Sequence, residues 1–150
     1  MKKHIYNSLI AFFGGSFGVS VIFIVYYSIF RIPYIENPFP ATFLGIFLWH
    51  LLGISFVEEG TKFLLIKRDI GQFPYAFFLG LGFGVVEAIL SHPFTQLGIF
   101  ERRIPAIILH ITTATILAYT IKKNKPFIGL PIAITLHTGF NLVSHYAGAQ

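Results

Sequence analysis

Residues 5–30 read IYNSLIAFFGGSFGVSVIFIVYYSIF, a run without any Asp, Glu, Lys, Arg or His. A helix needs about 20 mostly apolar residues to cross the hydrocarbon core of a bilayer. This run exceeds that length, and it is also too long for the apolar region of a cleavable signal peptide. It therefore predicts a first membrane span that remains in the protein and has enough length to tilt.

The composition of the whole chain agrees with this interpretation. Of the 150 residues, 55% are hydrophobic and 11% are charged, and the mean hydropathy is +0.73. A soluble domain has roughly 25% charged residues, so this surface is suited to lipid rather than water. The chain contains no cysteine, which excludes disulfide scaffolds, thiolate metal sites and a cysteine nucleophile.

Four more apolar segments follow, separated by charged or proline-containing stretches. The sequence thus predicts an all-α, polytopic membrane helix bundle of about five transmembrane helices, which form one domain over residues 1–150. Gly80 and Gly84 make a GxxxG pair, which lets two helix backbones approach closely. The predicted spans cover residues 5–30, 41–66, 74–91, 104–121 and 127–145.

The basic residues between the spans predict the orientation. Cytoplasmic loops are enriched in Lys and Arg, which favours a cytoplasmic N-terminus. This topology also explains the net charge of +5, so we expect the bilayer as a partner and no nucleic acid. The inner side would hold Lys2, Lys3, Lys67, Arg68, Lys122, Lys123 and Lys125, and the outer side only Arg31, Arg102 and Arg103.

Several polar side chains lie inside the predicted spans. An ionisable group there costs at least ~2.5–3.5 kcal/mol and is a functional-site hypothesis by default. Counted from the cytoplasmic ends at ~1.5 Å per residue, the glutamates, the histidines and Asn141 lie about 10–21 Å deep, which predicts a shared internal cavity. The polar residues are Glu58, Glu59 and Lys62 on the second span, Glu87 on the third, His110 on the fourth, and His137 with Asn141 on the fifth.

The spacing on the second span suggests different roles for the two adjacent glutamates. Lys62 follows Glu59 by three residues and Glu58 by four, so it can neutralise one of these carboxylates. Adjacent helical residues point ~100° apart. We therefore expect one glutamate to face the cavity and the other to form a structural pair. His137 and Asn141 share a helix face, so the amide can orient the ring or hold a substrate oxygen.

These residue types permit two kinds of hydrolytic chemistry. A buried carboxylate can act as a general base toward water, while His and Asn position the water and stabilise an oxyanion. Alternatively, Glu58, Glu87, His110 and His137 can bind a divalent metal such as zinc, with water in an open position. A purely structural ion-pair cluster of Glu58, Glu59 and Lys62 is the non-catalytic alternative.

Four motifs resemble those of the PrsW family of bacterial and archaeal membrane proteases, which are relatives of the CAAX proteases. Glu58-Glu59-Gly-Thr-Lys62 resembles the EExxK motif, and the run from Gly80 to Glu87 is similar to GxGFxxxE. The resemblance covers about residues 56–141. The chain is short for the family, and Ala88 stands where the family often has Asn. The third and fourth motifs correspond to Arg103 followed by His110 and to His137-Thr-Gly-Phe-Asn141.

The resemblance implies an intramembrane endopeptidase in a bacterial or archaeal cell membrane, which cleaves a membrane-anchored protein substrate. Water would be activated at a glutamate with histidine assistance and without a cofactor, zinc being the alternative. The short chain suggests either a homo-oligomer or a bound partner. Analogy with the CAAX proteases favours Glu58 as the base. The implied catalytic residues are Glu58, Glu59, Glu87, His110 and His137, with Lys62 and Asn141 in supporting roles.

Two other functions remain open at this point. An immunity or partner-binding membrane protein would keep the fold without turnover. A small ion transporter would use the same Glu and His side chains as a relay. Many transporters contain internal repeats, and we detect none in this sequence.

Overall fold

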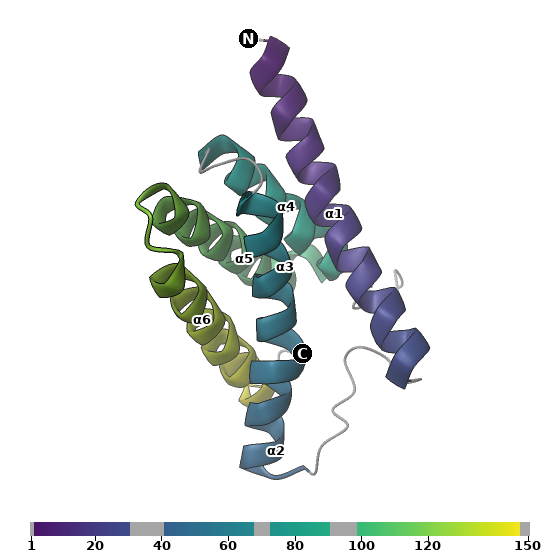
Figure 1. The fold of residues 1–150 in the computed structure, drawn as a ribbon. Helices are drawn as coiled ribbons and strands as arrows, with labels where there is room; N and C mark the ends of the chain where they lie inside the picture. Colours follow the sequence, from purple (N-terminus) through teal and green to yellow (C-terminus); the bar gives the residue numbers. More distant parts are fainter. Residues whose placement is uncertain (1, 31–40, 68–72, 91–98, 148–150) are drawn as a thin grey trace.

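The computed structural model describes residues 2–30, 41–67, 73–90 and 99–147, and within these ranges every element is helical (Figure 1). The helices pack against one another and form a bundle. Their bounds are α1 (Lys2–Phe30), α2 (Phe43–Leu48), the π-helical η1 (Trp49–Ser55), α3 (Phe56–Lys67), α4 (Phe73–Leu90), α5 (Ile99–Lys122) and α6 (Pro126–Tyr146).

Five helical stretches are long and apolar enough to cross a membrane, which confirms the predicted all-α membrane bundle. The predicted spans 74–91 and 127–145 agree with α4 and α6 to within one residue at each end. The first helix begins three residues before its predicted span, and the second begins at Phe43 rather than at residue 41. The fourth helix differs, because α5 begins at Ile99, before the predicted start at residue 104. Glu101 thus lies on α5 rather than in a loop, since Glu and Arg are good helix formers. The candidate spans are Ile5–Val25, Phe43–Ile66, Phe73–Leu90, Arg103–Lys122 and Pro126–Tyr146.

The second span is not a uniform α-helix. It starts at Thr42, whose side-chain oxygen accepts a hydrogen bond from the Gly45 backbone N–H at 3.1 Å. It then widens into η1 before it returns to α-helix at Phe56. The Trp49 ring packs over Gly53, where any Cβ atom would meet the ring. Short π-helical segments occur often at functional sites, and this one directly precedes the two adjacent glutamates.

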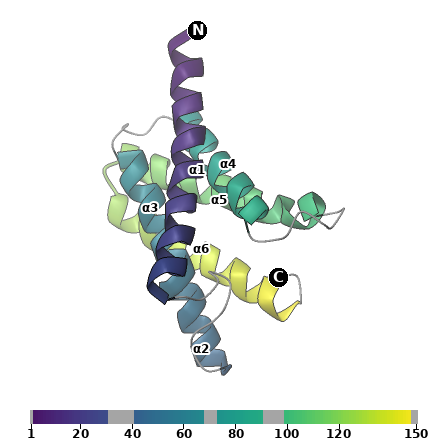
Figure 2. The same ribbon diagram turned by 90° about the vertical axis from the view of Figure 1, so that its right-hand side faces the viewer.

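α4 packs between α1 and α5, and close backbone contacts fix both interfaces (Figure 2). On the α5 side, a Cβ atom added to Gly80 would lie 2.7 Å from Ile111 Cα, and one on Gly84 would lie 2.9 Å from Ile107 Cα. The close approach predicted from the GxxxG pair is therefore present. On the α1 side, Gly82 lies against the backbone of Phe12.

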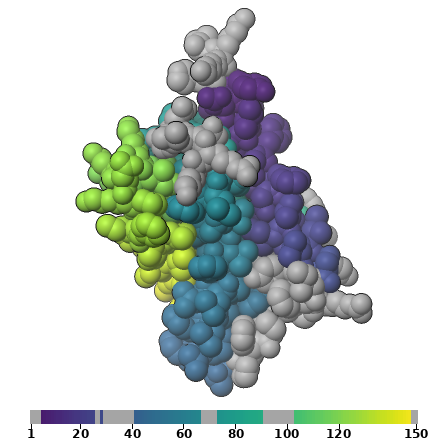
Figure 3. All heavy atoms as spheres, in the orientation of Figure 1, coloured from purple at the N-terminus to yellow at the C-terminus, as the bar shows by residue number. Residues whose placement is uncertain are grey.

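Apolar side chains fill the core of one half of the bundle and also cover its outer surface. A buried cluster joins the C-terminal half of α5 to the beginning of α4 and α6 and the end of α3; it includes Ile66, Leu79, Leu117 and Ala133. The face in Figure 3 is formed by α1, the α2–η1–α3 helix, α5 and α6. Large exposed apolar residues on the outside suit contact with lipid; they include Phe17, Ile24, Leu64, Phe127 and Val143.

The glycine contacts give a first testable prediction. Gly80→Ala is expected to lower the free energy of unfolding by about 1–3 kcal/mol, because the added methyl group overpacks the backbone of α5. Gly139→Ala is the matched control, since a Cβ atom there meets nothing within 4 Å. Thermal unfolding of both variants in one detergent measures the difference. Equal midpoints would contradict the close α4–α5 packing.

Candidate active site

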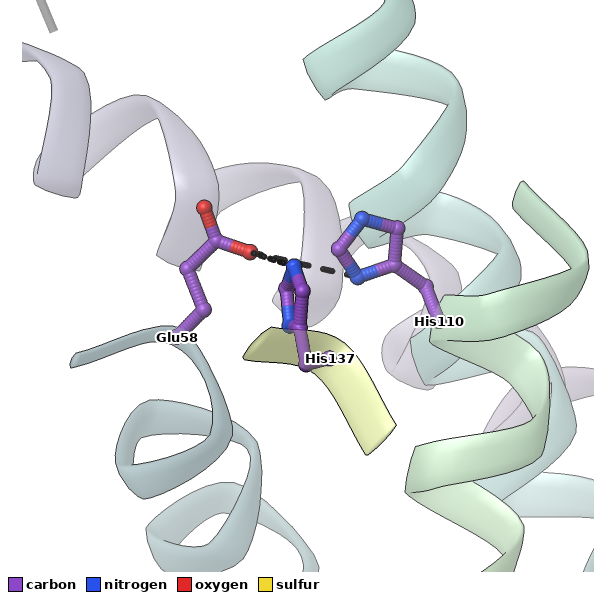
Figure 4. Close-up of side chains that lie close together, drawn as sticks. All are labelled: Glu58, His110 and His137. Atoms are coloured by element: carbon purple, nitrogen blue, oxygen red, sulfur yellow. Dashed lines mark ion pairs between the residues drawn. The ribbon is translucent and has the colours of Figure 1, made fainter. Parts of the chain in front are cut away.

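The polar residues predicted inside the spans converge from four helices. Glu58, Glu59 and Lys62 lie on α3, Glu87 on α4, His110 on α5 and His137 on α6. Among these, only Glu87 is partly accessible, with 18% of its side chain exposed. Figure 4 shows Glu58, His110 and His137 pointing toward one another from α3, α5 and α6. The predicted shared site therefore exists as a buried cluster near the middle of the bundle.

Lys62 is the central cation of this cluster. Its Nζ lies 2.6 Å from Glu59 Oε1, 2.7 Å from His110 Nδ1 and 3.2 Å from Thr113 Oγ1. An ammonium group has three donors and no acceptor, so these contacts use its full hydrogen-bonding capacity. The Lys62 ammonium also lies 4.8 Å from the centre of the Phe83 ring, which adds a cation–π contact.

The contact with Lys62 determines the proton position on His110. Because the ammonium only donates, His110 Nδ1 accepts, and the ring proton of the neutral imidazole is on Nε2. That Nε2–H donates to Glu87 Oε2 on α4. Both ring nitrogens of His110 are thus occupied. The ring also packs against Phe83, with 5.2 Å between the ring centres, so His110 is held in one orientation.

His137 lies between the two adjacent glutamates. Its Nδ1 is 2.7 Å from Glu59 Oε1, and its Nε2 is 3.7 Å from Glu58 Oε2. The Nδ1–H donates to the Glu59 carboxylate, so in the neutral ring Nε2 is the acceptor and faces Glu58. A carboxylate that orients a histidine through Nδ1–H is the arrangement of the serine-protease Asp–His pair.

The two glutamates therefore have different surroundings. Glu59 Oε1 accepts hydrogen bonds from Lys62, His137 and Thr113. Glu58 Oε2 instead faces both histidines, 3.7 Å from His137 Nε2 and 4.0 Å from His110 Nδ1. Separations of this size leave room for a bridging water. Both glutamates reach the same centre, and the structural pair expected from the spacing is formed by Glu59 and Lys62.

Thr113 and Phe83 belong to the cluster although neither was a candidate. Thr113 is fully buried and donates to Glu59 Oε1 at 3.2 Å. Its position three residues after His110 could have indicated that Thr113 lies in the cluster, because residues at this spacing share a helix face. Asn141 lies one turn after His137 on α6 and is partly exposed. Arg103 lies two turns before His110 on α5 and is also partly exposed.

Glu58, His110 and His137 also resemble a metal-binding group. Each offers one ligand atom, and the three atoms lie within 4.8 Å of one another. A carboxylate and two imidazoles are a ligand set that zinc accepts. However, the His110 nitrogen next to Glu58 is Nδ1, and this nitrogen already accepts a hydrogen bond from Lys62. A metal ion would compete with a buried ammonium for the same lone pair.

Comparisons with protein-family models, curated proteins and solved structures return no match.

Proposed function

We propose that this protein is an intramembrane endopeptidase, which hydrolyses peptide bonds of membrane-associated protein substrates with water activated by Glu58 and His137. One observation carries the proposal: Lys62, Thr113 and His137 hold Glu59 in place, while Glu58 faces the acceptor nitrogen of His137. Such an arrangement provides a general base and a positioned histidine in a buried site. The resemblance of the four motifs to the PrsW family supports the same function.

In the proposed reaction, water binds between Glu58 and His137. Glu58 takes one proton from this water, and the hydroxide oxygen bonds to the carbonyl carbon of the substrate peptide. The C–N bond then breaks as the leaving nitrogen receives the proton from Glu58. The products are a carboxylic acid and an amine, so one water is consumed for each bond.

The other members of the cluster would position these groups rather than react. Glu59 fixes His137 with its acceptor nitrogen toward Glu58, and Glu87 with Lys62 fixes His110. Lys62 also supplies positive charge near the oxyanion that forms in the transition state. Asn141, on the same face of α6 as His137, is the proposed amide donor to that oxyanion.

We propose that the reaction needs no metal. Lys62 supplies a positive charge at the histidine nitrogen that a metal ion would use. A dication next to this ammonium would meet strong repulsion in a low-dielectric site. If zinc were nevertheless bound, Glu58, His110 and His137 would hold it, and it would supply Lewis-acid chemistry.

The arrangement favours hydrolysis over ion transport. A transporter needs access to its site from both membrane faces in turn. Between the cluster and the end where α6 begins, the described core is apolar and buried, and it includes Leu79, Leu117 and Ala133. No chain of polar side chains crosses this described part of the core.

The experiment is cleavage of a panel of single-span reporter proteins by the purified protein, with products mapped by mass spectrometry. We expect cleavage at one or a few bonds near the membrane, with the same rate after treatment with a strong chelator. Loss of cleavage with chelator and recovery with zinc would instead establish a metalloprotease. Stable binding of a reporter without cleavage would favour the partner-binding alternative.

A further inference from the structure

The second span and α6 lie side by side in an antiparallel arrangement, so their interface can be followed from the membrane face to the buried site. At one end, the Phe43 and Tyr146 rings stack with 6.4 Å between centres. Next along the interface, the His50 and His145 rings lie 5.6 Å apart. At the inner end, Glu58 faces His137 across 3.7 Å. His145 is exposed and His50 is buried.

Three buried polar groups along this interface lack a hydrogen-bond partner among the described protein atoms. They are His50 Nδ1, Ser55 Oγ and Thr138 Oγ1. Ser55 lies three residues before Glu58, and Thr138 directly follows His137. Ser55 is fully buried, and Thr138 is 3% exposed. Along the two helices, all three groups thus lie at positions between the His50–His145 contact and the Glu–His cluster.

Six other hydroxyl groups in the membrane helices behave differently. The usual partner of a Ser or Thr hydroxyl inside a helix is the carbonyl oxygen four residues earlier. This bond is formed at 2.7–2.9 Å by Ser16, Ser20, Thr61, Thr112, Thr115 and Thr120. A buried hydroxyl without such a bond needs another partner, and internal water is the common one.

The π-helical segment sets the spacing of two of these groups, His50 and Ser55. In a π-helix the backbone hydrogen bonds connect residues five apart, so Ser55 lies one turn after His50. The α-helix then resumes and carries the same side of the helix on to Glu58. The opposite side of this segment is apolar, because Trp49 and Ile54 pack with Val19, Ile22 and Phe83. The His50 ring, in contrast, contacts the His145 ring of α6.

We propose that a file of water molecules runs between η1 and α6, from His145 past His50, Ser55 and Thr138 to Glu58. The path would bring water to a carboxylate that is otherwise fully buried. With the predicted cytoplasmic N-terminus, it opens at the outer face. The use of this water as the nucleophile rests on the proposed function, whereas the path itself does not.

The absence of cysteine from the sequence makes a direct test simple. Ser55→Cys and Thr138→Cys each introduce one thiol at a proposed water-lined position. Ala114→Cys is the matched control, because Ala114 is equally buried but lies in the apolar cluster. The probe is a small, charged methanethiosulfonate reagent, added to the purified protein in detergent. It reacts with the thiolate, which forms only where water reaches the sulfur.

We expect both path variants to react at least about tenfold faster than Ala114→Cys. Adding His50→Phe to the Ser55→Cys variant is expected to slow labelling at least about tenfold, because the ring change removes the polar lining. Rates equal to that of Ala114→Cys in protein that elutes as a single folded species would overturn the proposal. An unchanged rate with His50→Phe would overturn the route past His50.

Two features keep the test decisive. If Ser55→Cys fails to fold, Thr138→Cys tests the same path from the opposite helix. Labelling is also independent of any substrate, so it can fail while reporter cleavage succeeds, or succeed while no reporter is cleaved. Failure of the water path and failure of the protease proposal are therefore distinguishable.

Discussion

Glu58→Gln is expected to lower the cleavage rate by about 10²–10⁴-fold, which is the usual contribution of a general base. The amide keeps the size of the side chain but cannot accept a proton from water. Glu58 is placed for this role by its position opposite His137 Nε2 at 3.7 Å. The measurement is the initial rate of reporter cleavage by variant protein with the elution profile and helix content of the wild type.

Two further variants make this result specific. Glu59→Gln is expected to have a smaller effect on cleavage, because Glu59 orients His137 and binds Lys62 instead of reacting. Glu101→Gln, the same chemical change near the start of α5, should leave the rate unchanged. If Glu59→Gln removed activity and Glu58→Gln did not, the roles that we assign to the two glutamates would be reversed.

Lys62→Met is expected to destabilise the protein by about 3–5 kcal/mol, which is the usual cost of removing one partner of a buried ion pair. Methionine retains the length of the side chain but has no charge. The Glu59 carboxylate would then be buried without its cation, and His110 Nδ1 would lose its donor. Thermal or denaturant unfolding in detergent measures the loss.

A double variant removes the charge of the Glu59 carboxylate as well. Lys62→Met combined with Glu59→Gln is expected to recover a large part of the lost stability, because no isolated charge remains. A double variant as unstable as the sum of the two single variants would show that Lys62 and Glu59 act independently. That result would contradict the ion pair at 2.6 Å as the centre of the cluster.

Together, the proposed glutamate roles and the proposed water path give Glu58 a polar approach between η1 and α6. On the side toward the beginning of α6, the described core is apolar and closed. On the other side, buried polar groups extend from Ser55 and Thr138 to His50. The proposed hydrolysis needs water at a buried carboxylate, and the proposed path would supply it from one side without conducting ions across the bilayer.

The sequence by itself determined the membrane-helix architecture and the ionisable members of the central cluster. Span length and apolar composition are local properties, so the five helices could be predicted within a few residues. Polar residues are costly in lipid, so Glu58, Glu87, His110 and His137 stood out against an apolar background. Helix rise alone then placed them at similar depths.

Only the tertiary structure decided which atoms meet. Lipid-facing and inward-facing residues of a membrane helix are both apolar, so hydrophobicity does not reveal how each helix is rotated about its axis. The separation of Glu58 from the Glu59–Lys62 pair depends on these rotations, as does the inclusion of Thr113. The π-helical register of residues 49–55 depends on packing around Trp49 and Gly53. That packing, which sequence periodicity does not encode, sets the spacing of His50 and Ser55 before Glu58.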